Sequence, residues 1–236
     1  MRPLFFPAIL ILTYLIVGIF TITHYGINWD EPAHFMRGQT FLRFLTTGKK
    51  DYSELPHSSD LLYKPYKLDF GFEDPRRSIY QHSERSLMFY TYDIQKRGTH
   101  PAFSDIMAAL FNNMFYIKLG IAADIYSYNY YVIFVVALLI AGIYLWVKNL
   151  FGRFAALVSS LSLALFPVFW AEAHYNVKDV PQAVFYSFAL LFFYQAVVTK
   201  KIKFVGVFAL ASGFAFATKF KFVFVMPTIA LWLILR

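Results

Sequence analysis

The sequence contains no cysteine. Disulfide bonds, cysteine metal ligands and a thiol nucleophile are therefore excluded. Charged residues are also scarce, because they make up 15% of the 236 residues, whereas hydrophobic residues make up 58% and aromatic residues 21%. A soluble domain has about a quarter charged residues. The apolar residues here form long blocks separated by polar stretches, which is typical of an integral membrane protein.

Acidic residues are missing from the middle of every long apolar block. An ion-coupled transporter is expected to place an ionisable group near the bilayer midplane, so this absence argues against that class. The formal net charge of +8 comes largely from Lys and Arg at the ends of the apolar blocks. Cations in such positions mark topology and contact lipid headgroups, so we expect membrane lipid, and not nucleic acid, as a partner.

The apolar blocks predict an all-α polytopic membrane protein with about six transmembrane helices. The predicted spans are Leu4–Thr23, Tyr131–Leu150, Phe154–Trp170, Pro181–Val198, Phe204–Thr218 and Phe222–Leu235. The first block exceeds the apolar core of a signal peptide, about 7–15 residues, and no small-residue cleavage site follows it, so we interpret it as a retained span. The last two blocks are short, which predicts tilted or partly embedded helices.

Residues 1–236 are predicted to form a single membrane domain, in which 24–119 is a long non-cytoplasmic loop with interfacial helices. One amphipathic helix is predicted to follow Asp30 and to end at Gly48. A second is predicted over Pro101–Leu119, for which a poorly hydrophobic span is the alternative. Between them, Asp51–Arg97 shows no regular pattern and is predicted to be irregular.

Short basic loops give the orientation. They carry Arg2, Lys148, Arg153, Lys200, Lys201, Lys203 and Arg236, which all fall on one side when the spans alternate, so that side is predicted to be cytoplasmic. The opposite face then receives polar residues from three distant segments. These residues are Asp30, Glu31, Glu172, His174, Asn176, Lys178, Asp179 and Lys219.

Carboxylates and cations at the headgroup level suit chemistry on a lipid-phosphate-linked group. A carboxylate there can take a proton from an acceptor hydroxyl, and Lys or Arg can neutralise a leaving phosphate. Structural explanations stay open for each residue. Asp30 and Asp179 could instead cap helices. Lys178 and Lys219 could extend their ammonium groups to the membrane surface. Trp29 and Trp170 could anchor the protein at the membrane interface. His34, His100 and His174 lack the spacing of a metal site and fit rim positions.

Several short motifs occur in a recognisable order. They are Asp30-Glu31 after the first span, His100-Pro101 before the second interfacial helix, Leu150-Phe151-Gly152-Arg153 closing a span, Asp179-Val180-Pro181 opening another, and Gly213-Phe214-Ala215-Phe216-Ala217-Thr218-Lys219 closing the fifth. In this order and topology the sequence resembles the GT-C membrane glycosyltransferases. Within them it is similar to the protein O-mannosyltransferase and aminoarabinose transferase group, including the bacterial RgtA/B/C/D-like enzymes.

The resemblance implies a transferase that uses a polyprenyl-phosphate-linked sugar on the non-cytoplasmic face of the cell membrane, with inversion at the anomeric carbon. The acceptor would be a glycan, a lipid or a protein. The implied catalytic residues are Asp30 as the general base, with Glu31 and Asp179 orienting the acceptor or the base. The resemblance places Lys219 near the donor phosphate. We expect His100, His174 and Lys178, which share the same rim, to bind the donor or the acceptor as well. We expect no metal or other cofactor, although acids at the site permit a divalent cation.

Members of this group commonly have more spans, so the chain is expected to represent an N-terminal portion. The alternative function is a non-catalytic membrane protein, such as a lipid-carrier transporter, a flippase or a scaffold subunit. A flippase needs polar groups exposed alternately at both faces. The predicted cytoplasmic side offers only short basic turns, which favours the transferase.

Overall fold

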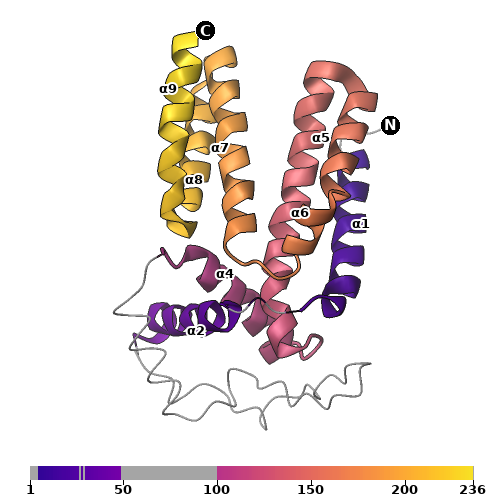
Figure 1. Cartoon of the computed structure of the whole chain (residues 1–236), viewed down its shortest axis with the longest axis vertical. Helices are drawn as coiled ribbons and strands as arrows, with labels where there is room; N and C mark the ends of the chain where they lie inside the picture. The colour runs from indigo at the N-terminus through magenta and orange to yellow at the C-terminus, as the bar shows by residue number, and fades with distance from the viewer. Residues whose placement is uncertain (1–4, 27, 29, 49–99, 236) are drawn as a thin grey trace.

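The computed structural model describes residues 5–26, 28, 30–48 and 100–235. Trp29 and the predicted irregular stretch Asp51–Arg97 lie outside these residues. Throughout the described ranges the regular structure is helical, with no strand. The long helices run along one direction in two groups, α1 and α5 in one and α7, α8 and α9 in the other, while α2 and α4 cross one end (Figure 1). The prediction of an all-α membrane protein is confirmed.

Three helical segments of the described chain are long and apolar enough to cross a membrane. They are α1 (Phe5–Thr21) with the 3₁₀ turn η1 (Ile22–His24), α5 (Asp124–Ala164), and α7 (Asp179–Thr199). α8 (Ile202–Thr218) is apolar but shorter, as is η5 (Phe220–Phe224) with α9 (Val225–Leu235). This agrees with the expectation that the last two predicted spans are short.

The α5 segment contains the predicted span Tyr131–Leu150 and most of the predicted span Phe154–Trp170. Gly152 interrupts it with φ 85° and ψ 178°, a conformation that glycine adopts at little cost, and the helix folds back there (Figure 1). The second arm ends at Ala164, and α6 (Pro167–Glu172) begins separately. A single helix over Phe154–Trp170 was therefore wrong. Pro167 disfavours helical geometry at Phe166, whose ψ is 112°.

The two crossing helices are α2 (Glu31–Thr47) and α4 (Phe103–Asn112), and a π-helical turn, η4 (Asn113–Lys118), continues α4. α2 ends as predicted at Gly48, where φ is 75° and the N–H donates to Phe44 O at 2.8 Å. α4 runs across the ends of the long helices instead of alongside them (Figure 1). This arrangement favours the interfacial interpretation of Pro101–Leu119 over a span.

A buried centre joins α2 and α4 to α5. Phe35 of α2 stacks on Tyr128 of α5 with ring centroids 4.1 Å apart. Beside them, Gln39 Nε2 donates to Asn112 Oδ1 at 2.9 Å and to the Tyr128 hydroxyl at 3.0 Å. Asn112 Nδ2 in turn donates to Asp124 Oδ1 at 2.7 Å. These contacts fix α2 and α4 against the base of α5, where the polar site lies.

The turns of the chain lie at two opposite ends of the bundle. The start of α1, the Gly152 turn, the α7–α8 turn and the end of α9 lie at one end (Figure 1). The other end holds α2, α4, the α6–α7 connection and the α8–η5 corner. The basic turn residues and the polar candidate residues are thus separated, as the alternation of spans predicts.

Candidate active site

A small cavity of about 60 Å³ lies where α2, the start of α4, the α6–α7 connection and the α8–η5 corner meet. Its walls are mainly polar, and two asparagines, a tyrosine and a valine complete the lining around the charged groups. The lining residues are Asn28, Asp30, Glu31, His34, His100, Tyr175, Asn176, Val177, Lys178, Asp179 and Lys219. The structure therefore brings together six of the seven residues predicted for the site, all but His174.

Asp105 is the buried anion behind this cavity. Its side chain is 0% exposed, and Arg37 binds its Oδ2 through Nε and Nη2. Lys178 Nζ lies 2.8 Å from the other oxygen, Oδ1. Burial by itself raises the pKa of the Asp105 carboxyl, but the hydrogen bond from His34 and the charges of Lys178 and Arg37 outweigh it, so this pKa lies below its ordinary value. Asp105 is therefore ionised.

Lys178 is held inside the protein and does not snorkel. Its side chain is 5% exposed, and besides pairing with Asp105 its Nζ donates to Pro101 O at 2.7 Å. Burial lowers the pKa of Lys178 to about 8, against the opposing effect of Asp105. The ammonium group consequently stays charged at neutral pH within a desolvated site.

Lys219 forms an ion pair with Asp179 across the start of α7 and the end of α8. The Lys219 side chain is 10% exposed, whereas that of Asp179 is 59% exposed. Asp179 does not cap α7. Asn176 Oδ1 does so by accepting from the backbone N–H groups of Lys178 at 3.1 Å and Asp179 at 2.8 Å. The Asp179 carboxylate is thus free to engage Lys219.

Asp30 is a second accessible carboxylate of the cavity, with 44% of its side chain exposed, whereas the more exposed Asp179 is paired with Lys219. It occupies the N-cap position of α2, yet its side chain makes no capping hydrogen bond to the described part of the chain. Its Oδ2 lies 3.6 Å from His34 Nε2. The capping explanation for Asp30 is therefore not supported by the geometry.

Glu31 has the opposite environment, although it is the next residue. It is 1% exposed, and its Oε2 accepts the Asn28 backbone N–H at 3.0 Å. Burial raises the pKa of the Glu31 carboxyl well above its ordinary value, and the charges of Asp30 and Glu172 raise it further. Neighbouring positions on a helix point in different directions, so one acid faces the cavity mouth and the other the interior.

The two predicted histidines differ in position. His100 lines the cavity, and its backbone oxygen accepts Arg37 Nη1 at 3.1 Å. Burial, then the charges of Lys219, Lys178 and Arg37, lower the pKa of its imidazole. His174 lies outside the cavity, 1% exposed, with its ring stacked on Tyr25 at 4.2 Å and its Nε2 3.0 Å from Thr21 Oγ1. These contacts fasten the α6–α7 connection to the end of α1.

Sequence reasoning missed Arg37 and Asp105. Asp105 falls outside the helical spacing of Phe103, Met107 and Phe111, and Arg37 is one of many basic residues between His24 and His100, so the sequence singles out neither. A weak signal existed, because Asp105 lies in the first turn of a helix preceded by the His100-Pro101 motif. Within the described residues, no group of three His, Asp or Glu side chains is arranged to hold a metal ion.

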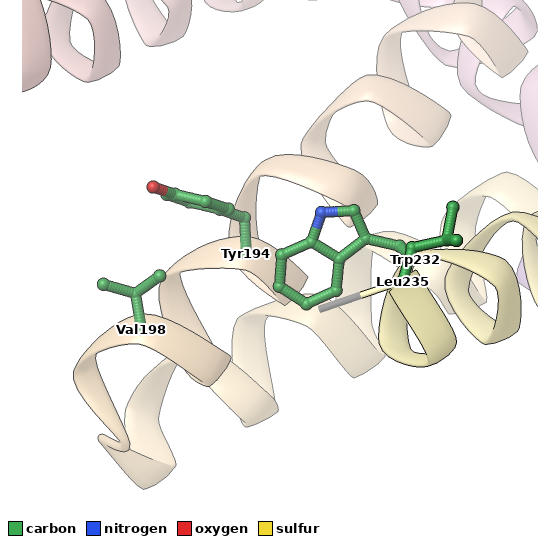
Figure 2. A pocket seen from close by; sticks show the side chains of 4 residues that line it. All are labelled: Tyr194, Val198, Trp232 and Leu235. Carbon is green, nitrogen blue, oxygen red and sulfur yellow. The ribbon is translucent and has the colours of Figure 1, made fainter.

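A larger hollow of about 380 Å³ lies near the other ends of α7 and α9. Figure 2 shows Tyr194 and Val198 on one helix and Trp232 and Leu235 on the other. Tyr194 lies 15 positions along α7 from Asp179, which corresponds to about 22 Å of helix. This hollow is thus remote from the charged cavity and offers no acid or cation.

More than half of the chain matches a known family model. Residues 99–236 match the family model described as dolichyl-phosphate-mannose-protein mannosyltransferase. No curated protein and no solved structure matches the chain significantly. The matched region includes Asp105, Lys178, Asp179 and Lys219, whereas Asp30, Glu31 and Arg37 precede it.

Proposed function

Because the chain belongs to the dolichyl-phosphate-mannose-protein mannosyltransferase family, and is thus a membrane glycosyltransferase, we propose that it transfers a sugar from a polyprenyl-phosphate donor to an acceptor hydroxyl. The observation that carries this proposal is the joining, in one cavity, of an exposed carboxylate with two buried lysines. The acids and lysines come from segments as far apart as Asp30 and Lys219. Such a cavity supplies a base and a phosphate-binding pair.

The chemistry assigned to the site is an inverting displacement. Asp30 takes the proton of the acceptor hydroxyl as its oxygen attacks the anomeric carbon, and the bond from that carbon to the phosphate oxygen breaks. The released electron pair stays on the phosphate. Lys178 and Lys219 offset this negative charge, which develops most strongly in the transition state. The donor phosphate competes with Asp179 for Lys219, because Asp179 is largely exposed and so easily displaced.

Asp30 suits the base better than Glu31 does. A general base must be ionised and must reach the acceptor, and Asp30 is the exposed carboxylate of the pair. The raised pKa of Glu31 reflects burial, which disfavours the ionised form of this acid. Glu31 therefore serves to shape the cavity and to fix the Asn28 backbone beside Asp30.

The site is assigned to the non-cytoplasmic face of the cell membrane in a multi-pass protein. This assignment is supported by the separation of the basic turns from the cavity. Lys148, Arg153, Lys200 and Lys201 belong to turns at the end of the bundle opposite the cavity (Figure 1). Short loops rich in Lys and Arg remain in the cytoplasm. A polyprenyl carrier lying in the bilayer would then present its phosphate beside α7 and α8.

The experiment is a transfer assay in membranes that contain the protein, with radiolabelled polyprenyl-phosphate mannose as the donor. We expect cleavage of the sugar–phosphate bond by the wild type, a loss of about a hundredfold or more in Asp30→Asn, and a loss of less than about tenfold in Glu31→Gln. Normal expression of the three proteins is the control. Normal transfer by Asp30→Asn would reject the assignment of the base. Movement of the lipid across the membrane without cleavage would instead favour a transporter.

A further inference from the structure

His34 lies between two carboxylates that come from different parts of the site. Its Nδ1 is 3.4 Å from Asp105 Oδ1, and its Nε2 is 3.6 Å from Asp30 Oδ2. The His34 side chain is 15% exposed, so it bridges the fully buried acid and the accessible one. Hydrogen bonds of catalytic groups are often longer before a substrate binds than during the reaction, so both distances fit a working contact.

The position of Asp105 favours a proton on one of the two ring nitrogens of His34. An ionised carboxylate can only accept, so the approach of Oδ1 to Nδ1 favours N–H on that nitrogen. Arg37 Nη2, which can only donate, also lies 3.5 Å from Nδ1 and competes with Asp105 for this nitrogen, but the contact with Asp105 is the shorter one. With Nδ1 protonated, Nε2 of the neutral ring carries a lone pair directed toward Asp30.

We infer that His34 accepts the proton that Asp30 removes from the acceptor hydroxyl, while Asp105 is the positioning residue that orients the imidazole. The inference rests on the proposed function. After the acceptor oxygen has attacked, the proton passes from the Asp30 carboxyl to His34 Nε2, which forms an imidazolium between two carboxylates. Asp30 returns to its ionised form for the next acceptor. The imidazolium then releases the proton to water at the open side of the cavity.

The neighbouring groups leave His34 as the suitable acceptor. Burial favours the protonated form of Glu31, and Arg37 and Lys178 favour the ionised form of Asp105, so neither acid is suited to take up this proton. The charged or titratable groups around the ring are Asp30 and Arg37 on its own helix, Asp105 on α4, Lys178 before α7, and His100. The two carboxylates nearest the ring approach its two nitrogens, Asp105 at Nδ1 and Asp30 at Nε2.

A structural role for His34, as a link between α2 and α4, predicts a different outcome from a proton-accepting role. In His34→Asn the side-chain amide can still donate to Asp105 but cannot take up a proton. In His34→Ala the space for a small base is opened. We expect both variants to fold and both to lose transfer of radiolabelled polyprenyl-phosphate mannose by about a hundredfold.

The deciding measurement is rescue by added imidazole. We expect imidazole to raise the rate of His34→Ala by at least about tenfold, to saturate, and to leave Asp30→Asn inactive, because a free base replaces the ring but not the first carboxylate. The circular dichroism and melting temperature of each variant serve as controls for folding. A wild-type rate in His34→Asn, or no rescue of a folded His34→Ala, would overturn the inference.

A second measurement does not depend on transfer. In protein labelled with ¹⁵N-histidine, the ring nitrogen shifts report which nitrogen is protonated, and the His34 signal is assigned by its loss in His34→Asn. We expect the neutral ring of the wild type to carry its proton on Nδ1 and to lose this preference in Asp105→Asn. The opposite tautomer in the wild type would also overturn the inference. Absence of transfer by a wild type with the expected tautomer would count against the proposed function alone.

Discussion

Gly38 of α2 packs directly on the backbone of Asp105 in α4. A Cβ added to Gly38 would lie 2.2 Å from the Asp105 carbonyl oxygen and 3.1 Å from the Ala109 Cβ. The two helices can approach this closely because Gly38 has no side chain. The adjacent Arg37 then reaches the Asp105 carboxylate. The central ion pair of the site therefore depends on a glycine that takes no part in the chemistry.

We expect Gly38→Ala to push α2 away from α4. The methyl group meets backbone atoms, which cannot rotate aside, so the variant should lose about 1–3 kcal/mol of unfolding free energy and most of its transfer activity. Thermal unfolding in detergent measures the first and the transfer assay the second. Gly206→Ala is the matched control. Nothing lies within 4 Å of its added Cβ, and alanine favours a helix. An equal effect of the two substitutions would contradict the prediction.

Asp105→Asn should be much more destabilising than Asp179→Asn. The first leaves Arg37 and Lys178 buried without their carboxylate, a loss of about 3–5 kcal/mol. The second removes a carboxylate that is 59% exposed, for which a loss of at most about 1 kcal/mol is expected. Denaturant titration of the purified variants measures both. Similar losses would show that Asp105 does not hold the site together.

The stability of the protein should depend on pH through Lys178. The pKa of this residue is about 8 in the folded protein, against an ordinary value of 10.5. Between these values the unfolded chain holds the extra proton, so the free energy of unfolding rises with pH. Below pH 8 both states are protonated and the contribution is constant.

Lys178→Met removes this titration. The stability difference, wild type minus variant, should therefore increase between pH 8 and 10.5, by an amount on the order of 3 kcal/mol. Melting temperatures measured for both proteins across this range provide the test. Asp105, Arg37 and Lys219 are present in both proteins, so their charges cancel in the comparison. A difference that is flat or falls with pH would refute the assignment of a lowered pKa to Lys178.

Asn176→Ala should loosen the start of α7. The substitution removes the oxygen that accepts from the backbone of Lys178 and Asp179, at a cost of about 1 kcal/mol. Because these residues line the cavity, transfer should decrease as well. Asn176→Ser keeps a capping oxygen and should lose less on both measures. If serine and alanine behave alike, the capping role of Asn176 is wrong.

Local signals in the sequence predicted much of the fold. The limits of α2 follow from Pro32 near its start and Gly48 at its end, both of which act through the geometry of a single residue. The Gly152 turn is of the same kind. Alternation of spans placed Asp30, Asp179 and Lys219 at one end without any knowledge of their contacts. Such predictions succeed because a membrane restricts each turn to one of two sides.

Tertiary packing decided what the sequence did not predict. Periodicity placed Asp105 outside the apolar stripe of its helix, yet the close approach at Gly38 buries it completely. The predicted topology placed His174 at the end of the bundle that holds the cavity, but it did not predict the direction of the imidazole ring. It turns toward Tyr25 and the end of α1. Side-chain direction depends on which helices are neighbours, and a single sequence does not show this.

The Asp105 carboxylate also imposes an order on the assembly of the protein. Arg37 lies 68 positions before Asp105, and Lys178 lies 73 positions after it. As the chain is synthesised, Arg37 and Asp105 can pair long before Lys178 has been made. The contact between Asp105 Oδ1 and Lys178 can form only after the α5 hairpin and the start of α7 have been synthesised. The cavity, whose lining extends to Lys219, is therefore complete only after most of the described chain has been made.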